Sequence, residues 1–168
     1  MRNKVINKDK YVVDLQRLQG LCTRNYALLL RLLPLQYELG QQWQIKMPNG
    51  LYFELSVLEI SAYTECYKLA QKVWAVSDEE GESSPSQVPG FMNMEFEFRV
   101  YHDAQMLEVI SYQKQSRIRA NNPYPNEHLH HKDEKLQVNQ LLKDWLNLAV
   151  KHQSKNNNKT LLEASTSE

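Results

Sequence analysis

MNMEFEFRVYHDAQMLEVI, residues Met92–Ile110, contains two stretches of alternating apolar and polar residues joined by a turn. Its first half places apolar side chains at every second position, the pattern of a strand with one face buried and one face open. His102–Gln105 make the turn, and we expect a returning strand from Met106 to Ile118. The segment therefore predicts an antiparallel strand pair.

Three further strands are predicted before this pair. Trp43–Met47 alternates in the same way and is followed by Pro48-Asn49-Gly50, in which Asn-Gly is a strong hairpin signal. Leu51–Val57 reads as the second strand of the hairpin, and Tyr63–Val76 reads as a third strand. The apolar face of that third strand would carry Tyr63, Tyr67, Leu69 and Val73.

Amphipathic helices are predicted before and after the strands. In the first, apolar residues recur at three- and four-residue steps from Val12 to Leu33, and Pro34 supplies a stop. Gly20 lies inside this pattern, so the helix could kink or split there. The last helix opens at Asp133-Glu134. We therefore predict an α+β fold, a five-stranded antiparallel sheet flanked by an N-terminal and a C-terminal helix that cover one of its faces.

We expect a single α+β domain over residues 1–152, long enough to bury a core of its own. Residues 77–90, SDEEGESSPSQVPG, are acidic and poor in large apolar side chains, which predicts a flexible loop between strands. Residues 153–168 are polar, which predicts a disordered tail. Removing either segment should barely change stability.

Net charge, apolar runs and cysteine content argue against several classes of partner and location for this protein. Twenty basic and twenty acidic residues give a formal net charge of zero, which argues against a nucleic acid or a membrane as partner, because each needs a basic surplus or a dense basic patch. The N-terminus lacks the apolar stretch of a signal peptide, and no apolar run is long enough to span a bilayer, so we expect a cytoplasmic protein. Cys22 and Cys66 are expected to be buried or half-buried thiols, because their spacing suggests no disulfide framework.

Histidines raise the question of a metal or catalytic site. His128, His130 and His131, with His102 and Asp103 elsewhere, could supply zinc ligands. The His-x-His pattern is short and common, however, and we favour histidines that cap and pack. No GxSxG elbow, cysteine with a recognisable histidine partner, or phosphate-binding glycine loop is present. We therefore predict no catalytic residue, no metal and no cofactor.

Two segments carry more polar side chains than a turn or a helix start requires. One is Tyr101–Ala104, and the other is PYPNEHLHHKDEKLQ (Pro123–Gln137) together with the asparagine at 139. We predict that they meet in space, either as a structural network that ties the last helix to the sheet or as a binding site for a ligand. The structural alternative is favoured, since most buried polar clusters serve architecture. The candidate residues are His102, Asp103, Arg117, Tyr124, Asn126, His130, Asp133, Lys135 and Asn139.

The same segments resemble a known family. RVYHDAQMLEV, YPNEHLHHKDEKLQVNQLLKDWL and LCTRNYALLLRLLP are similar to the YqiB-like family of gammaproteobacterial proteins, a domain of unknown function. The resemblance runs from the first helix to the last and implies a cytoplasmic bacterial protein, but it implies no activity. Leu129 stands where the family usually has Met, and residues 77–90 and the C-terminal tail look like additions to the family pattern.

Two classes of function remain. The first is a non-enzymatic binding or adaptor protein with an unidentified protein partner or small ligand, which could form a homodimer. The second is a site for a phosphate-bearing or nucleotide-like small molecule, which could be hydrolytic with His102 as acid or base. We favour the first, because catalytic groups normally form a recognisable constellation. In the phosphate-binding alternative, the positive charge that binds the phosphate would come from Arg99, Arg117, Arg119 and Lys135.

Overall fold

The computed structural model describes residues 14–47, 50–73, 94–113 and 133–165, and in the last of these ranges the side chains up to residue 153. Within these ranges the chain forms two helices and five strands. In chain order they are α1 (Leu15–Leu30), β1 (Gln42–Lys46), β2 (Leu51–Ile60), β3 (Thr64–Val73), β4 (Glu95–Tyr101), β5 (Met106–Tyr112) and α2 (Glu134–Ser165).

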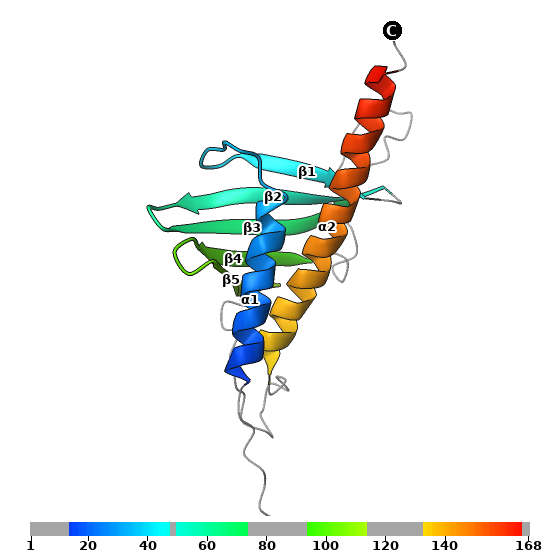
Figure 1. The fold of residues 1–168 in the computed structure, drawn as a ribbon. Coiled ribbons are helices and arrows are strands. Elements are labelled where there is room, and N and C mark those ends of the chain that lie inside the picture. Colours follow the sequence, from blue (N-terminus) through cyan, green and yellow to red (C-terminus); the bar gives the residue numbers. More distant parts are fainter. Residues whose placement is uncertain (1–13, 48–49, 74–93, 114–132, 166–168) are drawn as a thin grey trace, which may run out of the picture.

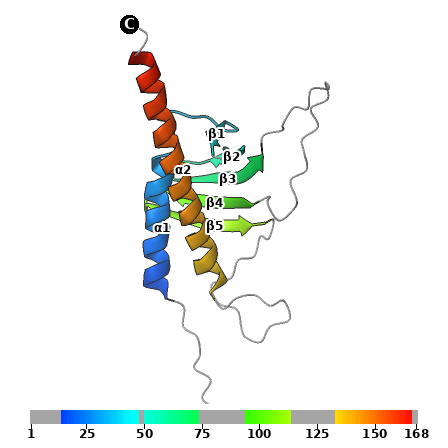
Figure 2. The same ribbon diagram turned by 90° about the vertical axis from the view of Figure 1, so that its right-hand side faces the viewer.

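The five strands form one sheet in which every strand is antiparallel to its sequence neighbours, in the order β1-β2-β3-β4-β5. α1 and α2 lie side by side on the same face of this sheet and run in the same direction (Figures 1 and 2). The predicted α+β class, a five-stranded antiparallel sheet with the two helices on one face, is therefore confirmed.

α1 begins at a local start signal and ends at Leu30, three residues before the end of the predicted pattern at Leu33. Asp14 accepts a hydrogen bond from the backbone N–H of Arg17 at 2.9 Å, which satisfies one of the unpaired amides of the first turn. The helix ends at Leu30, shortly before Pro34, whose ring disfavours helical geometry at the preceding residue. The helix continues through Gly20, so the split considered at this position does not occur.

The predicted first hairpin is present. Ile45 on β1 lies opposite Phe53 on β2, and both side chains are buried. Gly50, in the connection, has a φ of +71°, a left-handed conformation that glycine adopts without a steric penalty. Pro48 and Asn49, the other residues of the predicted turn, lie outside the described residues.

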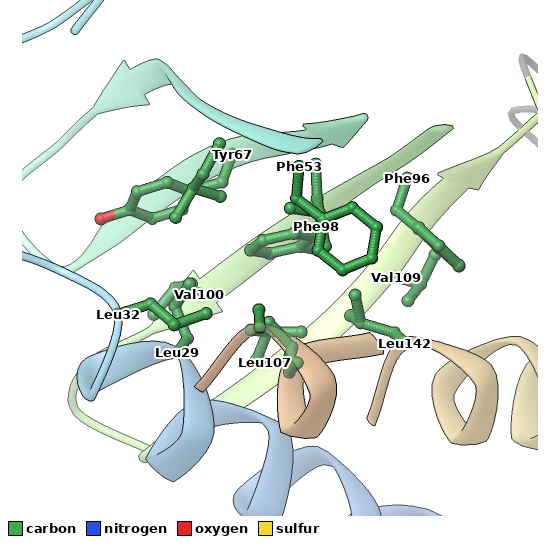
Figure 3. Close-up of a cluster of buried hydrophobic side chains, with 14 of the residues drawn as sticks. Leu29, Leu32, Phe53, Tyr67, Phe96, Phe98, Val100, Leu107, Val109 and Leu142 are labelled. Carbon is green, nitrogen blue, oxygen red and sulfur yellow. The ribbon is translucent and has the colours of Figure 1, made fainter. Parts of the chain in front are cut away.

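The core lies between the sheet and the two helices, as Figure 3 shows. Alternate residues of the central strands point into it in register, with Tyr67 opposite Phe98 and Phe98 opposite Val109. α1 contributes Leu29 and α2 contributes Leu142, both with no exposed surface. A fully buried side chain of this size stabilises the fold by about 1.5–3 kcal/mol, so this layer holds the helices against the sheet.

The start of β3 differs from the prediction. The strand begins at Thr64, whereas Tyr63 lies in the bend before it and is 70% exposed, so Tyr63 does not belong to the apolar face of the strand. The pairing of β2 with β3 shifts register between Val57 and Glu59, close to this bend. Such a shift displaces one strand along the other. The alternation of apolar and polar residues within a single strand does not reveal it.

α2 is longer than the predicted helix. It includes residues 153–165, which belong to the segment that we expected to be disordered. These residues contain no glycine or proline, so no strong helix breaker interrupts the helix there. The acidic segment 77–90 and the predicted continuation of β5 beyond residue 113 lie outside the described residues. In the part of the chain that the structure describes, neither helix is long and apolar enough to cross a bilayer.

Candidate functional site

His102 lies where β4 ends and the turn to β5 begins, and its imidazole links α1 to the sheet. Its Nε2 lies 3.0 Å from Oε2 of Glu65 on β3, and its Nδ1 lies 3.3 Å from the hydroxyl oxygen of Tyr26 on α1. The rings of Tyr26 and His102 meet edge to face, with centroids 5.9 Å apart. The turn residue is therefore fixed from two sides.

The Glu65 carboxylate is the centre of this cluster. It accepts hydrogen bonds from the Tyr37 hydroxyl, at 2.9 and 3.1 Å, and from the Tyr67 hydroxyl, in addition to its contact with His102. Burial raises the pKa of Glu65, but the hydrogen bonds from Tyr67, His102 and Tyr37 outweigh burial, so the net pKa is lowered. Burial, and to a smaller extent the hydrogen bond to the Glu65 carboxylate, raises the pKa of Tyr67. We call Tyr26, Tyr37, Glu65, Tyr67 and His102 the Glu65 network.

A second polar cluster surrounds Asn139 on α2, which is fully buried. Its Oδ1 accepts a hydrogen bond from the backbone N–H of Val109 on β5 at 3.2 Å, and its Nδ2 donates to the Lys135 backbone carbonyl at 2.8 Å. On α1, Asn25 donates to the Asn139 backbone carbonyl at 3.0 Å, and the Cys22 sulfur lies 4.0 Å from Asn139 Oδ1. Asn139 therefore joins α1, α2 and β5.

Cys22 faces the Asn139 cluster as a neutral thiol. Burial, and to a smaller extent the Glu108 carboxylate, raises the pKa of Cys22 to about 11. The Lys135 ammonium has a smaller effect that lowers this pKa. Because the thiolate is the reactive form, a thiol with this pKa is a poor nucleophile at neutral pH. Cys66 is also buried, and Nε of Arg99 donates to its sulfur at 3.3 Å. The prediction of two buried thiols is confirmed.

The structure places three of the described candidate residues in these two clusters and does not join them into one network. His102 belongs to the Glu65 network, whereas Asn139 and Lys135 belong to the second cluster, where the Lys135 ammonium forms an ion pair with Glu108 on β5. Both clusters are anchored on α1, through Tyr26 in the first case and through Cys22 and Asn25 in the second.

The remaining candidates are turn residues or undescribed. Asp103 accepts a hydrogen bond from the Ala104 backbone N–H at 2.9 Å within the β4–β5 turn. Asp133 immediately precedes α2, where its charge favours the positive end of the helix dipole. The other candidate residues lie outside the described part of the chain: Arg117, Tyr124, Asn126 and His130.

The chemistry of the Glu65 network suits a structural connection. Both carboxylate oxygens face donors, and a fully satisfied polar network makes the surrounding structure rigid. An acid or base must reach its substrate, and His102, with 32% of its side chain exposed, lines neither of the hollows described next. Among the residues that the structure describes, no group of three or more His, Cys, Asp or Glu side chains could hold a metal ion. The histidines considered as zinc ligands, His128, His130 and His131, are outside that part.

Two adjoining hollows follow the seam between α1 and α2 on the exposed side of both helices. Their volumes are about 490 Å³ and about 410 Å³, and Arg24 and Lys143 line both of them. We call the two hollows together the interhelical groove. Its lining on α1 includes Arg17, Gly20, Arg24, Ala27 and Arg31, and its lining on α2 consists of Gln140, Lys143 and Asn147.

The interhelical groove is basic along its length. Arg17 and Arg24 on α1 and Arg31, its C-cap residue, are seven residues apart, so they project from one side of the helix with a rise of about 10.5 Å between neighbours. Lys143 faces them from α2, and within the described residues none of these four cations forms an ion pair. Asp14 contributes a carboxylate to the lining, at the first turn of α1.

Sequence reasoning missed the groove and the Glu65 network for different reasons. The seven-residue spacing of the arginines is visible in the sequence, but charges on one face are usual for any solvated helix. Only the packing of α2 against α1 shows that this face lines a groove. The sequence contains no comparable pattern for Glu65 and Tyr37, because only tertiary packing brings these two residues together.

Comparison with known families gives a match over most of the chain. The model of the family described as "Protein of unknown function (DUF1249)" matches residues 28–155. The chain belongs to the DUF1249 family. This membership confirms the YqiB-like resemblance, and the matched region includes all five strands and every buried residue described on α2.

Relatives of this DUF1249 protein carry no description of activity. The chain is 35% identical over 143 residues to "Uncharacterized protein YqiB" of Escherichia coli strain K12, a match that covers 85% of this chain and 93% of the relative. The proteins of the same name from strains O6:H1 and O157:H7 match equally well. No solved structure matches. The function must therefore be inferred from the site itself.

Proposed function

We propose that this DUF1249 protein is a non-enzymatic binding or adaptor protein, and that the interhelical groove is the surface with which it binds an anionic ligand. The observation that supports this most is the row of Arg17, Arg24 and Arg31 opposite Lys143, with no ion pair to any of them in the described residues. A guanidinium group donates parallel hydrogen bonds to carboxylate or phosphate, so such a row favours an elongated anion.

In this proposal the polar residues predicted from the sequence hold the two helices of the groove in place from the side of the sheet. His102 fastens α1 to β3 through Tyr26, while Asn139 fastens α1 and α2 to β5. Both connections hold α1 against its neighbours, and the separation of the two helices determines the width of the groove. We therefore assign His102, Lys135 and Asn139 structural roles.

A hydrolytic site for a phosphate-bearing small molecule is less well supported. Two of the charges considered for it are already engaged, since Arg99 donates to the Cys66 sulfur and Lys135 pairs with Glu108. His102 is the acid or base of that hypothesis, but both of its ring nitrogens already contact members of the Glu65 network, Tyr26 and Glu65.

The proposed binding protein would act in the cytoplasm of a bacterium. Its two cysteines are free and buried, which fits a reducing compartment. The relatives named above are proteins of Escherichia coli.

Binding of fluorescein-labelled poly-L-glutamate, measured by fluorescence anisotropy at low ionic strength, tests the proposal. The variant Arg24→Gln/Arg31→Gln removes two cations from the groove. Its matched control, Gln42→Glu/Gln44→Glu, lowers the net charge equally at two exposed positions of β1. Each substitution changes the charge by one unit, so any difference between the variants reflects position rather than total charge.

We expect the wild type and the Gln42→Glu/Gln44→Glu control to bind alike. The arginine variant should bind about tenfold more weakly, because two exposed charge contacts of up to about 1 kcal/mol each are lost. Added salt should weaken binding to the wild type, since exposed charges are screened. The proposal is refuted if the wild type does not bind, or if the arginine variant binds as the wild type does.

A further inference from the structure

We infer that the ligand of the interhelical groove is an acidic α-helix of a protein partner, which packs along α1 and α2 as a third helix and carries carboxylates seven residues apart. This inference rests on the proposed function and adds the conformation and charge pattern of the partner. It follows from two separate features of the groove, the spacing of its arginines and the small residues between them.

The spacing of the cations suits a helical partner. An α-helix rises 1.5 Å per residue, so Arg17 and Arg24 of α1 and the C-cap residue Arg31 span about 21 Å. A partner helix with Asp or Glu at every seventh position presents its carboxylates on one face at the same interval. An extended peptide would cover that interval in about three residues, and residues three apart in a strand point to opposite faces. A helix therefore matches the spacing of the arginines better than an extended peptide does.

Small residues lie between the arginines on the same face of α1. Gly20 and Ala27 are also seven residues apart, both are exposed, and both line the groove. A Cβ built on Gly20 would meet no atom within 4 Å, so packing inside the described structure does not require glycine there. Glycine weakens a helix interior relative to alanine. The distance between packed helices depends on the side chains at their contact, so these two positions let a third helix approach closely.

A nucleic acid fits the groove less well than an acidic helix. Proteins that bind single strands combine basic groups with aromatic side chains on which the bases stack. No aromatic side chain is among the described residues that line the groove. Leu28 and Ala27 line its second hollow, and they offer an apolar contact of the kind that an amphipathic helix uses.

Two synthetic peptides of equal composition test the inference. Both are locked as helices by side-chain staples, and only the first, the aligned peptide, has its glutamates at every seventh residue. In the second peptide the same glutamates are distributed around the helix. We expect the aligned peptide to bind the wild type about tenfold more tightly, because only it can meet all the arginines at once. Poly-L-glutamate and a single-stranded oligonucleotide are measured in parallel.

The variant Gly20→Gln tests the close approach directly. Glutamine is the better helix former and has open space in the free protein, so the melting temperature should not fall. Binding of the aligned peptide should weaken at least about fivefold, because the new side chain fills the contact. The control is Leu15→Gln, at an exposed position of α1 that faces away from Gly20 and Ala27 and lines neither hollow, and it should bind as the wild type does.

The outcomes separate this inference from the proposed function. Equal binding of the two stapled peptides, or full binding of the aligned peptide by Gly20→Gln, overturns the helical partner. If poly-L-glutamate still binds through the arginines in that case, the proposed function stands. If poly-L-glutamate does not bind either, both fall. Tighter binding of the oligonucleotide than of the aligned peptide would count against a protein partner and so also overturn the inference.

Discussion

The Glu65 carboxylate receives donors from three parts of the chain: Tyr37 before β1, Tyr67 on its own strand and His102 after β4. Such a buried site favours the charged form of the acid only because several hydrogen bonds outweigh the loss of hydration. The same contacts connect α1, through His102 and Tyr26, to the middle of the sheet. The protonation of one carboxyl group is therefore coupled to the stability of the fold.

Glu65→Gln should remove this coupling. The pKa of Glu65 is lowered in the folded state, so its contribution to stability is present above the unfolded pKa of about 4.3 and is lost as the pH falls through the folded pKa. At about pH 7 the variant should be less stable by about 1.5–3 kcal/mol, the range for hydrogen bonds to a charged group. The difference should shrink towards about pH 3. Denaturant midpoints across this range check it, and a difference independent of pH would contradict it.

Asn139→Ala should be more destabilising than Asn25→Ala, although both asparagines are fully buried. Loss of Asn139 leaves the backbone N–H of Val109 without its partner, which costs about 1–3 kcal/mol. Loss of Asn25 leaves only the Asn139 carbonyl, which the α2 helix can still satisfy. Unfolding by denaturant measures both variants. Equal destabilisation would show that the Val109 contact contributes little.

The polar surplus around His102 and at the start of α2 was visible in the sequence, and it led us to predict that the two segments meet in one cluster. Among the described residues, His102 and Asn139 instead take part in two separate clusters. The partners were not visible. Glu65 and Tyr26 belong to elements whose patterns show only a strand and a helix, and the register of the sheet and the placement of α1 bring them to His102. Residue types can therefore mark a polar cluster, but long-range packing selects its members.

At the scale of elements, hydrophobic periodicity predicted the order of helices and strands because burial and periodicity have the same cause. Phe96 and Phe98 alternate in sequence because every second residue of β4 faces the helices. Element ends are governed by weaker and more local effects. β3 begins later than predicted beside a register shift, and α2 extends into a polar segment in which nothing interrupts the helix.

A chain that ends at Gln153 should be nearly as stable as the full chain. It keeps the buried Val150 and the hydrogen bond from Gln153 to the Leu32 carbonyl, at 3.5 Å. We expect the melting temperature to fall by less than about 4 °C. A chain that ends at Asn147 also loses Ala149 and Val150 from the core and should fall clearly further. A large fall on removing only residues 154–168 would show that those residues pack.

At the scale of the whole molecule, the helix layer has two functions in this account. Its inner side, with Leu29 and Leu142, completes the core over the sheet (Figure 3). Its outer side forms the interhelical groove, where Arg24 and Lys143 face each other across the seam. The net charge of zero led us to predict that neither a nucleic acid nor a membrane is the partner, but a net charge does not show where the charged residues lie. The arrangement of α1 beside α2 concentrates cations on one surface.

Amide chemical-shift mapping by NMR tests most directly whether binding occurs at the interhelical groove. Isotope-labelled protein is titrated with poly-L-glutamate at low ionic strength. We predict that the largest shifts fall on the lining of the groove, at Arg17, Gly20, Arg24 and Arg31 on α1 and at Lys143 on α2. Shifts centred on the β4–β5 turn at His102, or on the strands, would contradict the account.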